Sequence, residues 1–271
     1  MSISEPGPPH DHGVVVARFV EACSADDRIV AAFLGGSVAR GEADEHSDLD
    51  LCAITTVDDY DEVLAERADL IRRLGEPLFL ESFGLDAVAF FMLADGTEGE
   101  IFFMRESELD RIDAGSCRVL LDERGILEDA EFPPLEPDRM EQAEELRRVL
   151  SWFWHDLSHF IAAVGRGQLW WAAGQLEALR GYCVNLARIE QDAEAQDEPY
   201  WKLDATISTS RLDAVRSTFV PMERDPMLRA AKDLVTFHRE RAPAVARAQG
   251  LTYPAELERL MTRRLDELGG R

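Results

Sequence analysis

Residues 35–41 read Gly-Gly-Ser-Val-Ala-Arg-Gly, and residues 47–51 read Ser-Asp-Leu-Asp-Leu. The apolar run over 29–34 that precedes them is typical of a buried strand, and the second segment opens another apolar run. Side chains alternate faces along a strand, so Asp48 and Asp50 should point the same way while the leucine between them enters the core. The two segments therefore predict a glycine turn beside a pair of acidic side chains.

These residue types suit the binding of a nucleoside triphosphate and its magnesium ion. Gly35 and Gly36 let the backbone approach phosphates without a Cβ clash. Ser37 should begin a short helix, where its hydroxyl and the first amides can bind a phosphate, and Arg40 lies one turn later to pair with the triphosphate. Asp48 and Asp50 supply the hard oxygen ligands that magnesium prefers.

The spacing of these residues resembles the signature of the nucleotidyltransferase superfamily, the DNA polymerase β-like fold. That signature corresponds here to Gly36-Ser37, followed after ten residues by Asp48-Leu49-Asp50. The fuller string looks like its small bacterial members, which include aminoglycoside and lincosamide nucleotidyltransferases. This resemblance implies an enzyme that moves NMP, with AMP as the first expectation, from ATP or another NTP to a hydroxyl and releases pyrophosphate. It implies Mg²⁺ as cofactor, and nucleotide contacts from Gly35, Gly36, Ser37 and Arg40, with Ser47 as a further candidate.

The superfamily usually adds a third acid from a neighbouring strand. Glu100 is our candidate on an expected return strand over 98–104, and Glu98 on the same face is the alternative. Whether this acid acts as metal ligand, general base or both stays open. Some antibiotic nucleotidyltransferases take their base from a glutamate on a C-terminal helix, which makes Glu177 a second candidate for that role.

The order of elements predicts two folded regions after a short tail. Pro-, Gly- and His-rich residues 1–13 suggest a disordered tail. Residues 14–130 alternate helices, strands and a hairpin, which is an α+β pattern expected to form a mixed sheet with helices. A proline linker over 131–137 leads to 138–271, where helical periodicity predicts a bundle of four or five helices. The chain is expected to fold as a nucleotidyltransferase domain followed by this bundle.

The helices and strands expected in these regions are helix 14–23, strand 29–34, a short helix near Val38, strand 48–55, helix 58–74, strands 87–93 and 98–104, a short helix over 107–113, strand 119–122, and helices 138–164, 168–191, 212–220, 225–248 and 254–268.

The chain is acidic, with 53 Asp and Glu against 29 Lys and Arg and a net charge of −24. Such a surface disfavours nucleic acid and anionic membranes as partners, and it suits a cationic small molecule, although acidity also serves solubility alone. Four widely spaced cysteines suggest free thiols and a reducing cytoplasm. No apolar run is long enough to span a bilayer. The resemblance also implies that the chain could form a homodimer, because the superfamily often builds a shared site at a dimer interface.

His155 and His159 lie four residues apart on an expected helix, a spacing that can bind a transition metal. Asp156 and Ser158 lie between them, but the sequence indicates no third ligand. Structural histidines beside Trp152 and Trp154 are the favoured interpretation.

Two other functions fit the motif. A toxin–antitoxin type of nucleotidyltransferase would modify a protein or tRNA, and the acidic charge argues against tRNA. A catalytically silent nucleotide-binding regulatory module would keep the fold without turnover, and the intact acidic pair argues against it.

Overall fold

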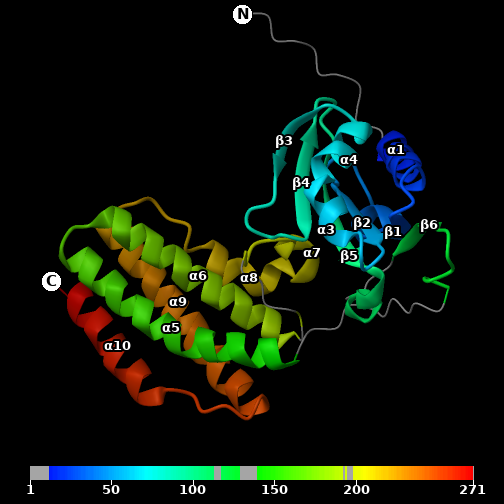
Figure 1. Ribbon diagram of the computed structural model, residues 1–271. Coiled ribbons are helices and arrows are strands. Elements are labelled where there is room, and N and C mark those ends of the chain that lie inside the picture. Colours follow the sequence, from blue (N-terminus) through cyan, green and yellow to red (C-terminus); the bar gives the residue numbers. More distant parts are fainter. Residues whose placement is uncertain (1–11, 113–116, 129–138, 192, 194–197, 271) are drawn as a thin grey trace, which may run out of the picture. The chain divides into compact units, whose positions relative to one another are not determined.

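The structure is a computed structural model that describes residues 12–112, 117–128, 139–191, 193 and 198–270. The chain divides between Leu135 and Glu136 into two units, each of which is described by itself (Figure 1). The tail expected at 1–13 and the linker expected at 131–137 lie outside the described residues, except that His12 and Gly13 belong to the first helix.

The N-terminal unit contains a mixed six-stranded sheet in the order β3-β4-β5-β2-β1-β6. β2 and β5 are parallel, and each of the other neighbouring pairs is antiparallel. The strands are β1 Ile29–Leu34, β2 Leu49–Thr55, β3 Pro77–Glu81, β4 Val88–Leu93, β5 Glu98–Arg105 and β6 Arg118–Asp122. The predicted α+β class and mixed sheet are confirmed.

The helices of this unit are α1 His12–Ser24, α2 Gly36–Arg40, α3 Tyr60–Ala65, α4 Arg67–Leu74 and the 3₁₀ helix η1 Glu106–Arg111. The single helix predicted over 58–74 is wrong, because the backbone leaves the helical region at Glu66, at φ −91° and ψ 5°. Strand β3 was not predicted. It is a short edge strand that begins at Pro77 and is partly exposed on both faces, so it lacks the alternation that marks a strand.

The two faces of the sheet have different coverings. Helices α1 and α4 pack on one face, where Phe19 and Ile71 join Leu49 in one hydrophobic cluster. A second cluster on the opposite face contains Cys52 and Met104 and is covered by the segments around η1 and after β6. Strand alternation then places Asp50 with Cys52, on the face away from α1 and α4.

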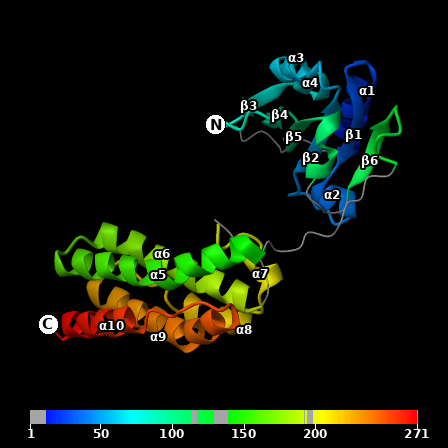
Figure 2. The ribbon, with the colours of Figure 1, turned by 60° about the horizontal axis from the view of Figure 1, so that its bottom comes forward.

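The C-terminal unit is helical and its long helices lie side by side (Figure 2). They pack through a large apolar cluster that includes Trp154, Leu179 and Leu234, and a smaller cluster adjoins it around Leu150. The helices are α5 Arg139–Gly165, α6 Leu169–Glu190, α7 Leu203–Thr206, α8 Thr209–Arg216, α9 Arg224–Ala248 and α10 Ala255–Gly269. The predicted helical C-terminal region is confirmed, and the short α7 was not predicted.

The four cysteines carry free thiols, and burial raises the pKa of Cys23 to about 12. None of the helices in the described part of the chain has the length and apolar character needed to cross a bilayer. A cytoplasmic location stays a prediction.

His238 on α9 is fully buried in the C-terminal unit. Its ring stacks on Phe153 at 4.1 Å between centroids and meets the edge of Trp154 at 5.2 Å. Burial among apolar rings lowers its pKa from 6.5 to about 3. The unfolded chain takes up a proton here near pH 6.5, and the folded chain does so only near pH 3, so acidification across that window destabilises the unit.

We therefore expect that His238→Phe will reduce the loss of unfolding free energy as the pH falls below about 6.5. In the native chain His238 alone removes up to about 1.4 kcal/mol of unfolding free energy per pH unit below about pH 6.5. All five tryptophans lie after residue 135, so tryptophan fluorescence in denaturant titrations reports this unit. His46→Ala, at an exposed histidine of the other unit, should leave the profile unchanged. Equal slopes for His238→Phe and the native chain would contradict the prediction.

Candidate active site

The glycine turn lies against Asp50. Strand β1 ends at Leu34, and the Gly35 amide then donates a hydrogen bond to the Asp50 carbonyl at 2.8 Å. Gly36 has a φ of +60°, a conformation that favours glycine. A Cβ at Gly36 would lie 1.6 Å from Asp50 Oδ2, so no other residue fits without moving that carboxylate. The turn and the acid are thus packed as one unit.

Helix α2 continues from this turn and carries two further candidate residues. Ser37 lies in its first turn, and its carbonyl accepts a hydrogen bond from the Glu42 amide at 3.0 Å. Arg40 ends the helix, and its Nε forms an ion pair with Glu42 Oε2 at 2.7 Å. Because the Arg40 side chain is partly exposed, this surface pair is weak and can exchange for a phosphate oxygen.

Ser47 closes the loop that leads into β2. Its Oγ accepts a hydrogen bond from the Asp44 amide at 2.9 Å and donates one to Asp44 Oδ1 at 3.2 Å. The Asp44 carboxylate also accepts from the His46 amide, and these bonds lower its pKa. The contacts of Ser47 thus shape the turn before Asp48, and a nucleotide contact for Ser47 remains a prediction.

The third acid comes from the parallel neighbour of β2. Asp50 on β2 is in register with Glu100 on β5, so their side chains leave the same face of the sheet. Between them the backbones are closely packed, because a Cβ at Gly99 would lie 2.6 Å from the Leu49 carbonyl. Glu98 shares the face of Glu100 but is exposed at the start of the strand.

Electrostatics link Glu100 to both aspartates. The pKa of Glu100 is raised by partial burial first, and then by the negative charges of Asp50 and Asp48. Three acidic side chains held together in this way repel one another and attract a cation. Magnesium is usually bound by one or two carboxylates, and waters and phosphate oxygens complete its coordination. Asp48, Asp50 and Glu100 could therefore hold such an ion beside the glycine turn.

A phosphate-compatible turn packed on an acidic cluster is typical of enzymes that transfer phosphorus groups with divalent metals. Residues 16–86 match the family model for the nucleotidyltransferase domain, a stretch that contains the turn and both aspartates but ends before Glu100. The match identifies residues 16–86 as a nucleotidyltransferase domain, which supports a transferase activity for the chain.

Two solved structures are similar over most of this chain. An aminoglycoside 6-adenyltransferase from Bacillus subtilis has 14% identity and a TM-score of 0.45, with 97% of this chain and 98% of that chain covered. A nucleotidyltransferase-like protein from Exiguobacterium sibiricum 255-15 has 10% identity and a TM-score of 0.42, with 87% and 77% covered. A search of curated proteins found no match.

Glu177 lies on α6 of the C-terminal unit and is exposed. Its Oε2 forms an ion pair with Arg180 Nη1 at 2.5 Å, and it accepts a hydrogen bond from the Tyr200 hydroxyl. Arg180 is buried and donates to the Thr218 hydroxyl and carbonyl. Glu177 thus belongs to a polar cluster joining α6 to the segment after α8, and its role as a base remains a prediction.

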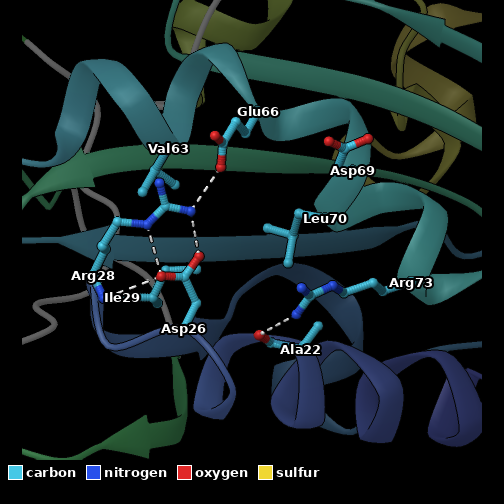
Figure 3. Close-up of a pocket in the computed structure, with 9 residues that line it drawn as sticks. All are labelled: Ala22, Asp26, Arg28, Ile29, Val63, Glu66, Asp69, Leu70 and Arg73. Atoms are coloured by element: carbon cyan, nitrogen blue, oxygen red, sulfur yellow. Dashed lines mark hydrogen bonds and ion pairs between the residues drawn. The ribbon is translucent and has the colours of Figure 1, made fainter.

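Figure 3 shows a pocket of the N-terminal unit that is lined by Arg28 and Ile29 at the start of β1. The glycine turn follows the other end of this strand. The wall of the pocket contains Arg28, whose Nη2 pairs with Asp26 and with Glu66, each at 2.7 Å (Figure 3). Arg28 and the turn are separated by strand β1, roughly 20 Å of extended chain. These ion pairs tie the α3–α4 junction to the start of β1, and the pocket is separate from the candidate site.

Glu100→Gln should stabilise the β2–β5 pair at neutral pH. The raised pKa means that the folded state disfavours the ionised form, so this destabilising effect is absent at low pH and develops as pH rises through the folded pKa. Removing the charge should raise the free energy of unfolding by about 0.2–1 kcal/mol, the scale of a solvent-screened charge interaction.

Hydrogen exchange of the β2 and β5 amides, compared between native chain and variant at equal pH, measures this gain. Glu98→Gln is the matched control, since it removes an exposed carboxylate from the same strand and face. The prediction is wrong if both variants change the protection of these amides against exchange equally, or if Glu100→Gln lowers that protection.

Proposed function

We propose that the chain is a Mg²⁺-dependent nucleotidyltransferase that moves AMP from ATP to a hydroxyl of a small cationic molecule, with an aminoglycoside or lincosamide as first choice. The observation that carries this proposal is the packing of the Gly35-Gly36 turn on Asp50, with Glu100 in register beside it. That arrangement combines a phosphate-binding backbone with a carboxylate set suited to a hard cation.

In this proposal Asp48, Asp50 and Glu100 hold the magnesium ion. The ion, when bound, would supply neutralisation of charge on the phosphate oxygens. Gly36 keeps the backbone open to the phosphates, Ser37 would bind the β- or γ-phosphate, and Arg40 would pair with the triphosphate. For Arg40 this requires exchange of its present partner, Glu42.

The acceptor hydroxyl needs a base. As its oxygen bonds to the α-phosphorus, the bond to the pyrophosphate oxygen breaks and the hydroxyl proton passes to a carboxylate. Glu100 is the first candidate for this base, because it lies in register with Asp50 beside the proposed ion. Glu177 is the alternative, and single-turnover rates of Glu100→Gln and Glu177→Gln decide which one takes the proton.

The acceptor class is supported by charge and by the motif. A net charge of −24 favours a cationic acceptor over an anionic one. The Gly-Gly-Ser-Val-Ala-Arg-Gly string resembles enzymes that modify aminoglycosides and lincosamides. A homodimer is part of the proposal because related enzymes build shared sites, and sedimentation with and without nucleotide measures it.

The activity is tested by incubating the chain with labelled ATP, other NTPs and Mg²⁺ against aminoglycosides, lincosamides, candidate proteins and tRNA. We expect a mass increase of one AMP on a cationic small molecule, together with released pyrophosphate. Label on a protein or tRNA alone would replace the small-molecule acceptor with the toxin–antitoxin type of activity. Nucleotide binding without transfer to any acceptor would favour the silent regulatory module.

Asp50→Asn should lower kcat/KM for nucleotidyl transfer by about 10²-fold or more, the scale of losing one electrostatic group in a preorganised site. Asparagine keeps the shape beside Gly36 but loses the charge that would hold the cation. Glu45→Gln, at an exposed acid of the preceding loop, should leave kcat/KM within about twofold. Rates are measured as pyrophosphate release at saturating Mg²⁺. Native activity of the Asp50→Asn variant would contradict the proposed role of Asp50.

A further inference from the structure

Three potential metal ligands converge on helix α5. His155, Asp156 and His159 each offer a ligand atom, and these atoms all lie within 4.8 Å of one another. The histidines are one helical turn apart, with ring centroids 4.4 Å from each other. The spacing of the two histidines is visible in the sequence, but the approach of Asp156 is visible only in the structure.

Asp156 is held in place from two sides. Its Oδ1 lies 2.9 Å from His155 Nδ1, and its Oδ2 accepts a hydrogen bond from the Tyr182 hydroxyl of α6 at 2.9 Å. The Asp156 side chain is only 13% exposed. Burial first, and then the bond to Asp156, raise the pKa of Tyr182, so the phenol stays a donor. A hydrogen-bonded second partner of this kind orients metal-binding side chains.

We propose that His155, Asp156 and His159 bind one divalent transition-metal ion, with Zn²⁺ as the first choice. Imidazole and carboxylate ligands suit zinc, whereas magnesium prefers sites built from oxygen alone. Tetrahedral zinc with bonds of about 2.0–2.1 Å places its ligands about 3.3 Å apart. The three ligand atoms lie within 4.8 Å of one another, and side-chain rotations would close the remaining distance when the ion binds.

The site has a solvent-facing side, because the His155 side chain is 54% exposed. Three protein ligands leave a fourth position for water, the pattern of zinc sites that stay open to exchange. The proposed ion would tie together adjacent turns of α5 and, through Tyr182, brace α5 against α6. This site differs in ligand chemistry from the Asp48, Asp50 and Glu100 cluster, so it stands independently of the proposed nucleotidyl transfer.

Zinc binding is measured by competition with a chromophoric chelator, using the full chain with Asp48→Asn and Asp50→Asn to remove the other acidic cluster. We expect one equivalent of Zn²⁺ per chain, and Co²⁺ should give the visible absorption of a site with nitrogen ligands. His155→Ala with His159→Ala should weaken binding at least tenfold. Tyr182→Phe should weaken it about tenfold through loss of the bond to Asp156.

The control variant is His10→Ala with His12→Ala, which removes the other closely spaced histidine pair of the sequence and should keep full affinity. Tryptophan fluorescence gives a second readout, since Zn²⁺ should raise the unfolding temperature of the native chain but not of the His155 and His159 double variant. Circular dichroism checks folding, and Asp156→Asn replaces the double variant if that variant is unfolded.

The proposal is overturned if the double variant, or Asp156→Asn in its place, retains native zinc affinity. It is also overturned if the native chain binds less than one equivalent, or if removing His10 and His12 abolishes binding.

Discussion

The contact between Gly36 and the Asp50 carboxylate constrains the whole candidate site. Glycine at φ +60° leaves no room for a Cβ, which would lie 1.6 Å from Asp50 Oδ2. The adjoining Gly35 amide holds the Asp50 carbonyl, so the end of β1 and the beginning of β2 are joined through backbone and side chain together. The direction of α2, and with it the positions of Ser37 and Arg40, follows from this junction.

The pairing of strands in the sheet brings a third acidic side chain to this junction. Because β5 runs parallel to β2, Glu100 lies in register with Asp50 on the face away from α1 and α4. Partial burial first, and then repulsion by Asp50 and Asp48, raise the pKa of Glu100, so its ionised form costs stability in the folded state. Proteins commonly accept such local cost where a site needs charge, and here a divalent cation would relieve it.

Sequence reasoning predicted the elements whose signals are local. The apolar run of β1, the glycine turn, the acid pair and the long amphipathic helices all appear close to their expected bounds. Glu100 was placed on the right strand because hairpin alternation put it beside Gly99 and Ile101. Its register with Asp50 needed the sheet, since no local pattern specifies which strands become parallel neighbours.

The features that were missed depend on tertiary contacts. Strand β3 pairs only with β4 in the described sheet, and its exposure follows no regular alternation. The break between α3 and α4 falls at Glu66, whose carboxylate pairs with Arg28, 38 residues earlier. Asp156 joins the two histidines through its side-chain conformation and its bond to Tyr182, which a helical wheel cannot show.

The parallel pairing of β2 with β5 has a consequence for how the domain assembles. Between Asp50 and Glu100 the chain forms two helices and two strands, so these neighbours in space are 50 residues apart in sequence. Contacts of such long separation form after local ones, because a large loop must close first. A growing polypeptide that has reached only residue 86 already contains the glycine bend and both aspartates, yet the strand that flanks them has not been synthesised. The acidic centre is thus completed late in folding, once the β4–β5 hairpin docks against β2.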